Sequence, residues 1–239
     1  MSGFVEFTFG SGDENVGKKS EKFKGEGGRS YRISLAWWPG VEDGKLDLDA
    51  SPKFVGGQRH YIEGVGYVMN QGPEYTTLAG GPPRMAVATI IVVWPTDSSG
   101  NVDGGRLKSG DFKVMPWIFS GDKYKSISPI HKEFPQGQHD MTVACTDTKY
   151  QKMTFSPCRE SLLRKLVEGG DKTKDFVDTI ISEVQRISSS IQDDIGRELT
   201  VDQIREKMSG GGAVPTGASS ATATTSADID DLVDGLLDD

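Results

Sequence analysis

The run from Arg84 to Trp94 constrains the fold of this chain more than any other stretch. It is the strongest apolar run in the sequence, it is rich in Val and Ile, and Pro95 ends it. β-branched residues favour extended backbone, and a run that is apolar on both faces is typical of a strand covered on both sides. It is far shorter than the roughly 20 apolar residues that span a membrane. We therefore expect a central buried strand here.

Shorter segments with alternating apolar and polar residues predict further strands, separated by turns rich in Gly and Pro. Gly64 and Gly66 suggest a bulge within one of them, and Pro116 suggests an edge strand or a bulge in another. Little helical periodicity precedes residue 156, so residues 1–155 are expected to form a β-rich body. The strand candidates are 4–9, 29–37, 59–69, 112–119, 124–130, 141–146 and 150–155, and the longer loops are 10–28, 41–58 and 71–83.

Helical patterns begin at Ser156. We expect Ser156 to be a helix N-cap and Pro157 to occupy the first helical position. That helix is expected to stop at Gly169-Gly170. A longer helix over 172–195 carries apolar residues at spacings of three and four, which form a stripe that packs on the sheet or pairs with a second copy of the chain. Of the two arrangements, we favour packing on the chain's own sheet. The stripe consists of Phe176, Ile180, Val184, Ile187, Ile191 and Ile195.

A last helix is predicted from Thr200 to about Met208. Gln203 stands in the capping-box position relative to Thr200, and Leu199 and Ile204 are spaced to form a hydrophobic staple. Residues 156–208 are thus expected to be a helical segment that packs on the body or serves in oligomerisation. The predicted fold class is α+β, with a β-rich antiparallel sheet body of non-standard type, C-terminal helices and an acidic tail. An OB-like barrel is the second choice, because the β region is larger than a minimal OB domain needs.

The end of the chain separates into a linker and a tail. Residues 209–227 contain Gly, Ser, Thr and Ala with almost nothing to bury, which is typical of a flexible linker. Residues 228–239 hold six Asp and five apolar residues spaced for one helix face. This pattern predicts a segment that folds when its stripe meets a partner; an ordinary charged terminus is the alternative. The expected partner-binding residues are Asp228, Ile229, Asp230, Asp231, Leu232, Val233, Leu236 and Leu237.

The formal net charge of -8 comes largely from that tail. Without the tail's six Asp, the 27 basic residues face 29 acidic ones, and residues 1–155 carry 18 of each. The overall charge therefore does not indicate a nucleic-acid-binding protein, and local clusters must carry that argument.

No catalytic or cofactor-binding motif is found. The three histidines lie in separate contexts, and the two cysteines, Cys145 and Cys158, lack metal-ligand spacing. We expect neither a cofactor nor an enzyme activity. Few cysteines, no apolar run of membrane-spanning length and no signal-like pattern in Met1–Glu6 lead us to expect a cytosolic protein.

Two stretches combine cations with aromatic residues, the pairing that single-stranded nucleic acid requires because cations neutralise phosphates and aromatic faces stack on unpaired bases. Each has a local net charge of +4, over 18–38 and 106–132. Trp37, Trp94 and Phe119 are expected in the core, whereas Phe23, Trp38 and Tyr124 fit either role. The candidate nucleic-acid-binding residues are Lys18, Lys22, Phe23, Lys24, Arg29, Arg32, Trp38, Lys108, Lys113, Lys123, Tyr124, Lys125 and Lys132.

This layout of β-rich body, uncharged linker and acidic tail resembles bacterial and phage single-stranded DNA-binding proteins. The stretches FKVMPWIF (112–119), CTDT (145–148) and MTFSPCRE (153–160) are similar to podovirus proteins that act as single-stranded DNA-binding cofactors of the phage RNA polymerase. The resemblance, which covers most of residues 80–168, implies binding at melted promoters, and a tail that recruits enzymes and competes with DNA. This tail departs from the common pattern, because it ends in Asp238-Asp239 instead of an apolar pair such as Pro-Phe.

We therefore expect a sequence-tolerant single-stranded DNA-binding protein in the cytoplasm of an infected bacterial host. Its tail would recruit the phage RNA polymerase or a replication enzyme. The sequence leaves open whether the chain forms a homo-oligomer. The alternative is a viral structural or assembly protein with an acidic docking tail and no specific role in DNA binding.

Overall fold

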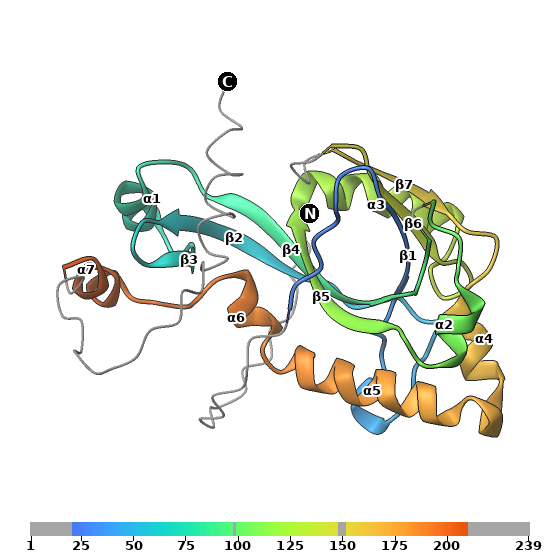
Figure 1. Ribbon diagram of the computed structural model, residues 1–239. Helices are drawn as coiled ribbons and strands as arrows, with labels where there is room; N and C mark the ends of the chain where they lie inside the picture. The colour runs from blue at the N-terminus through green and yellow to red at the C-terminus, as the bar shows by residue number, and fades with distance from the viewer. Residues whose placement is uncertain (1–20, 98, 148–151, 210–239) are drawn as a thin grey trace, which may run out of the picture.

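A computed structural model describes residues 21–97, 99–147 and 152–209 (Figure 1). The predicted strand 4–9, Lys18, residues 210–227 of the predicted linker and the tail lie outside the described residues, whereas Ser209, predicted as the first linker residue, ends a helix. The described part is an α+β structure built on one antiparallel sheet, as the sequence predicts. The strands are β1 (Ser30–Leu35), β2 (Val55–Ile62), β3 (Gly66–Met69), β4 (Arg84–Val93), β5 (Lys113–Ser120), β6 (Met141–Cys145) and β7 (Met153–Pro157).

Seven α-helices are found in the described ranges, together with short 3-10 turns at Val41–Asp43 and Gly170–Lys172. The α-helices are α1 (Pro73–Ala79), α2 (Gly104–Lys108), α3 (Gly121–Glu133), α4 (Leu162–Glu168), α5 (Lys174–Ser188), α6 (Ile191–Ile195) and α7 (Val201–Ser209).

Strand β4 is the centre of the sheet, and the prediction of a buried central strand is confirmed. It pairs along its length with β5 on one edge. Its other edge is shared: β2 pairs with its first half and β1 with its last three residues. The path therefore runs β3-β2-β4-β1-β6-β7, with β5 beside β4. Because β5 and β7 each pair with one strand only, the described sheet stays open. The non-standard sheet is therefore confirmed and the OB-like barrel is not found.

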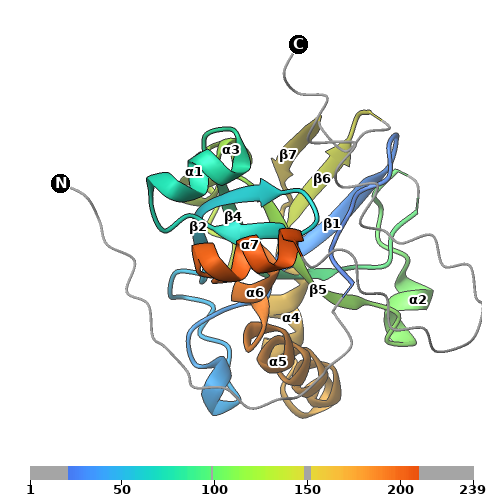
Figure 2. The ribbon, with the colours of Figure 1, turned by 90° about the vertical axis from the view of Figure 1, so that its left-hand side faces the viewer.

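The shared edge of β4 divides the molecule into two parts. Strands β2 and β3 with helices α1 and α7 project to one side, and we call this part the arm (Figures 1 and 2). The remaining strands and helices form the body. The arm has a small core of its own, made by Ile62, Val65, Val68, Tyr75 and Ile204.

The apolar stripe predicted over 172–195 packs on the protein's own sheet. Ile180, Val184 and Ile187 of α5 and Ile191 and Ile195 of α6 are at most 2% exposed, so these five residues pack within the chain, while Phe176 is half-buried. The prediction of one continuous helix was wrong, because the chain turns at Ser189-Ser190 between α5 and α6. Serines favour helix ends over interiors, and the break keeps α6 against the sheet.

Two segments have a different structure from the one predicted. Residues 59–69 are a hairpin and not one strand, because Gly64 and Gly66 adopt positive φ values of 75° and 88° that turn the chain. Residues 124–130 lie in helix α3 and not in a strand. The Ser120 hydroxyl accepts a hydrogen bond from the Lys123 backbone N–H and caps that helix.

Two further element boundaries were also wrong. The loop expected over 71–83 contains helix α1, with Pro73 in its first turn. The helix expected from Ser156 begins only at Leu162, where the Ser161 hydroxyl accepts from the Arg164 N–H. Ser156 instead pairs with Thr142 in the β6–β7 ladder. Sheet pairing, a tertiary contact, overrides the local Ser-Pro signal.

The capping box at α7 is confirmed. The Thr200 N–H donates to the Gln203 side-chain oxygen at 2.9 Å, and the Gln203 N–H donates to the Thr200 hydroxyl at 3.3 Å. Leu199 and Ile204 both pack in the arm's core, as the staple requires. Helix α7 is therefore anchored on the arm, and the linker starts there.

Candidate nucleic-acid interface

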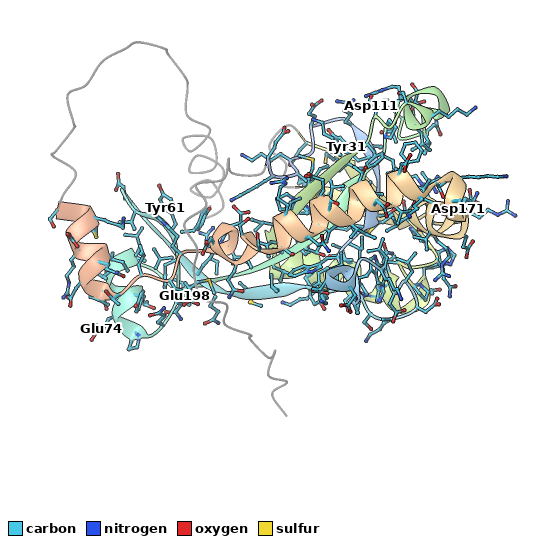
Figure 3. The ribbon with its side chains drawn as sticks, turned by 90° about the horizontal axis from the view of Figure 1, so that it is seen from below. Tyr31, Tyr61, Glu74, Asp111, Asp171 and Glu198 are labelled. Atoms are coloured by element: carbon cyan, nitrogen blue, oxygen red, sulfur yellow. The ribbon has the colours of Figure 1, made fainter. Side chains whose placement is uncertain are left out.

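A groove of about 2100 Å3 lies between the arm and the body. One wall is the β2–β3 hairpin. The other wall is formed by the segment before β1, by β1 itself and by the start of β5. Residues at the end of α5, in α6 and after α6 line the groove between the two walls. Figure 3 shows Tyr61 on the arm, with Tyr31 and Asp111 on the body, on the same side of the molecule.

The arm wall is a short aromatic ladder. Tyr61 and Tyr67 are partners across β2 and β3, with ring centroids 5.4 Å apart. The Arg59 guanidinium lies 3.6 Å from the Tyr67 ring centre and donates to the Ile195 backbone oxygen at 2.8 Å. Side chains alternate along a strand, so His60 and Ile62 point to the arm's other face and are buried. This alternation leaves Tyr61 38% exposed on the groove side.

The body wall carries Tyr31. Its hydroxyl accepts a hydrogen bond from the Glu26 N–H at 2.9 Å, and the Arg29 guanidinium lies 5.6 Å from its ring centre. Burial raises the pKa of the Tyr31 phenol above its usual value, so it stays neutral at physiological pH. The ring of Phe23 meets it edge-on at 5.2 Å, which holds Tyr31 in place.

The charge of the groove is balanced. Ion pairs join Lys22 to Asp194 at 3.4 Å, Arg29 to Glu26 at 2.8 Å, Arg106 to Asp111 at 2.6 Å and Lys113 to Glu21 at 3.7 Å. The pairs of Arg29, Arg106 and Lys113 join exposed groups, and such pairs are worth at most about 1 kcal/mol, so a phosphate can displace their carboxylates. The lining cations are Lys22, Lys24, Arg29, Arg106, Lys113, Arg186 and Arg197, and the equal number of acids comprises Glu21, Glu26, Glu63, Asp111, Asp193, Asp194 and Glu198.

Four of the predicted nucleic-acid-binding cations meet in this groove, although they come from two distant stretches. Lys22, Lys24 and Arg29 precede β1, and Lys113 begins β5. The two stretches come together because the Phe23 N–H donates to the Pro116 backbone oxygen at 2.9 Å, on the edge of β5. Residues 21–28 contain no helix or strand, in agreement with the predicted loop, but this loop is held on the sheet: it crosses from β5 to the end of β6, where the Gly28 N–H donates to the Cys145 oxygen.

Three of the predicted contact residues are structural instead. Phe23 is 4% exposed and packs edge-on against Trp117, and Trp38 is fully buried, with its indole N–H donating to the Leu35 oxygen. Neither ring can stack on a base. Arg32 is held by Asp140 at 2.8 Å and by the Glu160 backbone oxygen at 2.8 Å. The core positions expected for Trp37, Trp94 and Phe119 are confirmed.

The remaining predicted contact residues lie elsewhere. Lys123, Tyr124, Lys125 and Lys132 are on helix α3, and none of them lines the groove. Lys108 ends α2 and does not line it either.

The sequence pattern did not lead us to Tyr61 and Tyr67, nor to Arg186 and Arg197 of the groove. Both tyrosines were assigned to one continuous strand, in which they could not face each other. Reading Gly64 and Gly66 as a hairpin turn would have placed Tyr61 opposite Tyr67. Arg197 reaches the groove because its backbone pairs with Tyr67 and Met69 and its guanidinium donates to the Val65 oxygen, contacts that no local pattern signals.

Other classes of site are not seen in the described part of the chain. No group of three or more His, Cys, Asp or Glu residues there is arranged to hold a metal ion. None of the described helices combines the length and the apolar character that crossing a membrane requires. Comparison of the chain with models of known families, with curated proteins and with solved structures finds no match.

Proposed function

We propose that the groove binds single-stranded DNA with little preference for base sequence. The observation that carries this proposal is the ladder of Tyr61, Tyr67 and Arg59 on the arm wall. The ladder holds Tyr67 under a guanidinium and leaves Tyr61 38% exposed beside it. An ordered aromatic ring at a groove wall is the element that stacks an unpaired base, and it does so for any base.

The cations of the groove complete the arrangement. In the free protein Arg29, Arg106 and Lys113 are paired with exposed carboxylates, which keeps the side chains in place without a ligand. A phosphate accepts the same hydrogen bonds with more charge, so binding exchanges weak surface pairs for phosphate contacts. The exchange favours a flexible single strand, which can bring its phosphates to these cations and its bases to the arm at the same time.

Titration with a labelled oligo-dT strand and with a duplex of equal length tests this proposal. We expect the single strand to bind more tightly, because duplex bases are stacked on each other and cannot reach Tyr61. Each neutralised phosphate of a single strand contributes about -0.7 to the slope of log K against log salt, so contacts from three or four cations predict a slope between about -2 and -3. Equal affinity for both ligands, or no binding at low salt, would contradict single-strand binding and favour the assembly role.

We further propose that the tail over 228–239 recruits a partner enzyme, the phage RNA polymerase in the first instance, within the host cytoplasm. Support comes from the apolar stripe between Ile229 and Leu237 and from the resemblance to polymerase cofactors. An amphipathic segment of this kind recognises an apolar groove on a protein.

Deletion of residues 228–239 should abolish capture of the purified phage polymerase by the immobilised protein and leave the dT affinity unchanged or slightly higher. The affinity can rise because the six aspartates that the deletion removes would repel phosphates whenever the tail approached the bound strand. A matched chain in which the five apolar tail residues become Ser keeps that charge and should also lose the polymerase. If either chain still captures the polymerase fully, recruitment depends on a part of the chain outside the tail.

A further inference from the structure

A second, smaller cavity adjoins the groove where strand β5 begins, and we call it the side pocket. Its volume is about 320 Å3. This is at the small end of the roughly 300–1,000 Å3 of ligand pockets, which suits a single planar ring system. Thr179, Glu183 and Arg186 of α5 recur at spacings of four and three residues and form one wall. The residues that the side pocket shares with the groove are Glu21, Phe112, Lys113, Met115 and Arg186.

The less exposed part of the lining is apolar. Met115 is buried, and Phe112 and Val114 are half-buried. The Phe112 ring packs between two others, with centroid distances of 5.7 Å to Trp94 and 6.1 Å to Phe176. The side pocket therefore offers a packed apolar surface on which the face of a ring can lie.

A backbone donor and acceptor also face the side pocket. The Pro116 oxygen accepts a hydrogen bond from the Phe23 N–H, so the peptide groups of Pro116 point away from β4. These directions alternate along a strand, and the register between β4 and β5 is continuous, so the N–H and C=O of Val114 point away from β4 as well. In the described part of the chain, no backbone group outside the sheet hydrogen-bonds to Val114. Because Val114 lines the side pocket, this donor and acceptor lie side by side there.

We infer that the side pocket binds one base of the single strand and reads its edge through the Val114 backbone. This inference rests on the proposed function. Each of the four bases carries a donor next to an acceptor on its pairing edge, as thymine does with N3–H and O4, and these edges are exposed only in an unpaired strand. The Val114 pair therefore accepts any base, which agrees with binding that tolerates sequence.

The position of Lys113 favours a base of the bound strand over an unrelated small molecule. Lys113 lines both cavities, and its pair with Glu21 is exposed. A phosphate that takes the place of Glu21 would hold the strand at the mouth of the side pocket. The base attached to the neighbouring sugar can then turn inward onto Phe112 and Met115. The groove and the side pocket would thus bind different bases of one strand, the first by stacking on Tyr61 and the second by its edge.

A strand of N3-methylthymidine tests the inference in the full-length protein. The methyl group removes the N3–H donor and blocks that edge, but it leaves the ring face that stacks on Tyr61. We expect this strand to bind about tenfold more weakly than oligo-dT of equal length, measured by fluorescence anisotropy at the same low salt. Thr179→Trp fills the side pocket from an exposed position of α5. It should lower the dT affinity by a similar factor and abolish the difference between the two strands.

Ser182→Trp provides the matched control, since Ser182 is exposed on the same helix and lines neither cavity. It should bind both strands as the wild type does, and circular dichroism checks that both variants are folded. Tyr61→Ala should still distinguish the two strands. Equal binding of both strands by the wild type, or full dT affinity in Thr179→Trp, would overturn the inference and leave the groove proposal standing. Absence of any dT binding by the wild type would overturn both.

Discussion

Replacing Tyr61 by alanine should weaken the binding of an oligo-dT strand by about tenfold to a hundredfold, measured by fluorescence anisotropy at fixed low salt. Stacking of a base on an aromatic side chain is worth about 1–3 kcal/mol by alanine substitution, and each 1.4 kcal/mol is tenfold in affinity. Tyr61 is the position where this loss should be largest, because it presents 38% of its surface while its neighbour Tyr67 is half-buried under Arg59.

Two variants serve as controls for this result. Tyr61→Phe keeps the ring and should keep most of the affinity, which separates stacking from hydrogen bonding by the phenol. Tyr124→Ala removes a tyrosine of nearly equal exposure, 37%, from helix α3, and should change the affinity less than twofold. An unchanged affinity in Tyr61→Ala, or a greater loss in Tyr124→Ala, would refute the groove as the binding site.

Asp140→Ala should lower the free energy of unfolding by about 3–5 kcal/mol, measured by urea denaturation. Asp140 is fully buried, and its carboxylate accepts hydrogen bonds from the Ser34 hydroxyl, from the Arg32 guanidinium at 2.8 Å and from the Leu162 N–H at 3.0 Å. These donors come from β1 and from the start of α4. Removing one partner of a buried pair leaves the other charge uncompensated, which is the costly way to break it.

Asp140→Asn should cost less than Asp140→Ala, because the amide oxygen can still accept from Arg32 and Leu162. Burial raises the pKa of the Asp140 carboxyl, and the bonds from Ser34, Leu162 and Arg32 offset part of the rise. Asp122→Ala, which breaks an exposed pair with Lys125, serves as the control and should cost less than about 1 kcal/mol. A loss of less than 1 kcal/mol in Asp140→Ala would show that this network does not hold β1 to α4.

The same network explains why Arg32 could be mistaken for a DNA-binding residue. In the sequence it stands among cations and aromatics, on the polar side of a predicted strand. Its partner Asp140 is 108 residues away, and it becomes a neighbour only because β1 pairs with β6. Phe23 and Trp38 present the same problem. A cluster of cations and aromatics predicts the composition of a site, but burial decides which members are accessible.

The sequence by itself determined the features that depend on neighbours in the chain. The apolar run of β4, the capping box of Thr200 and Gln203, and the stripe that buries Ile187 need only local spacing. The tertiary structure decided which strands pair, and therefore which side chains meet. It turned 59–69 into a hairpin that sets Tyr61 against Tyr67, and it brought Lys22 and Lys113 into one groove. The physical reason is that a local pattern states which face of an element is apolar, whereas a site is made by pairing between distant elements.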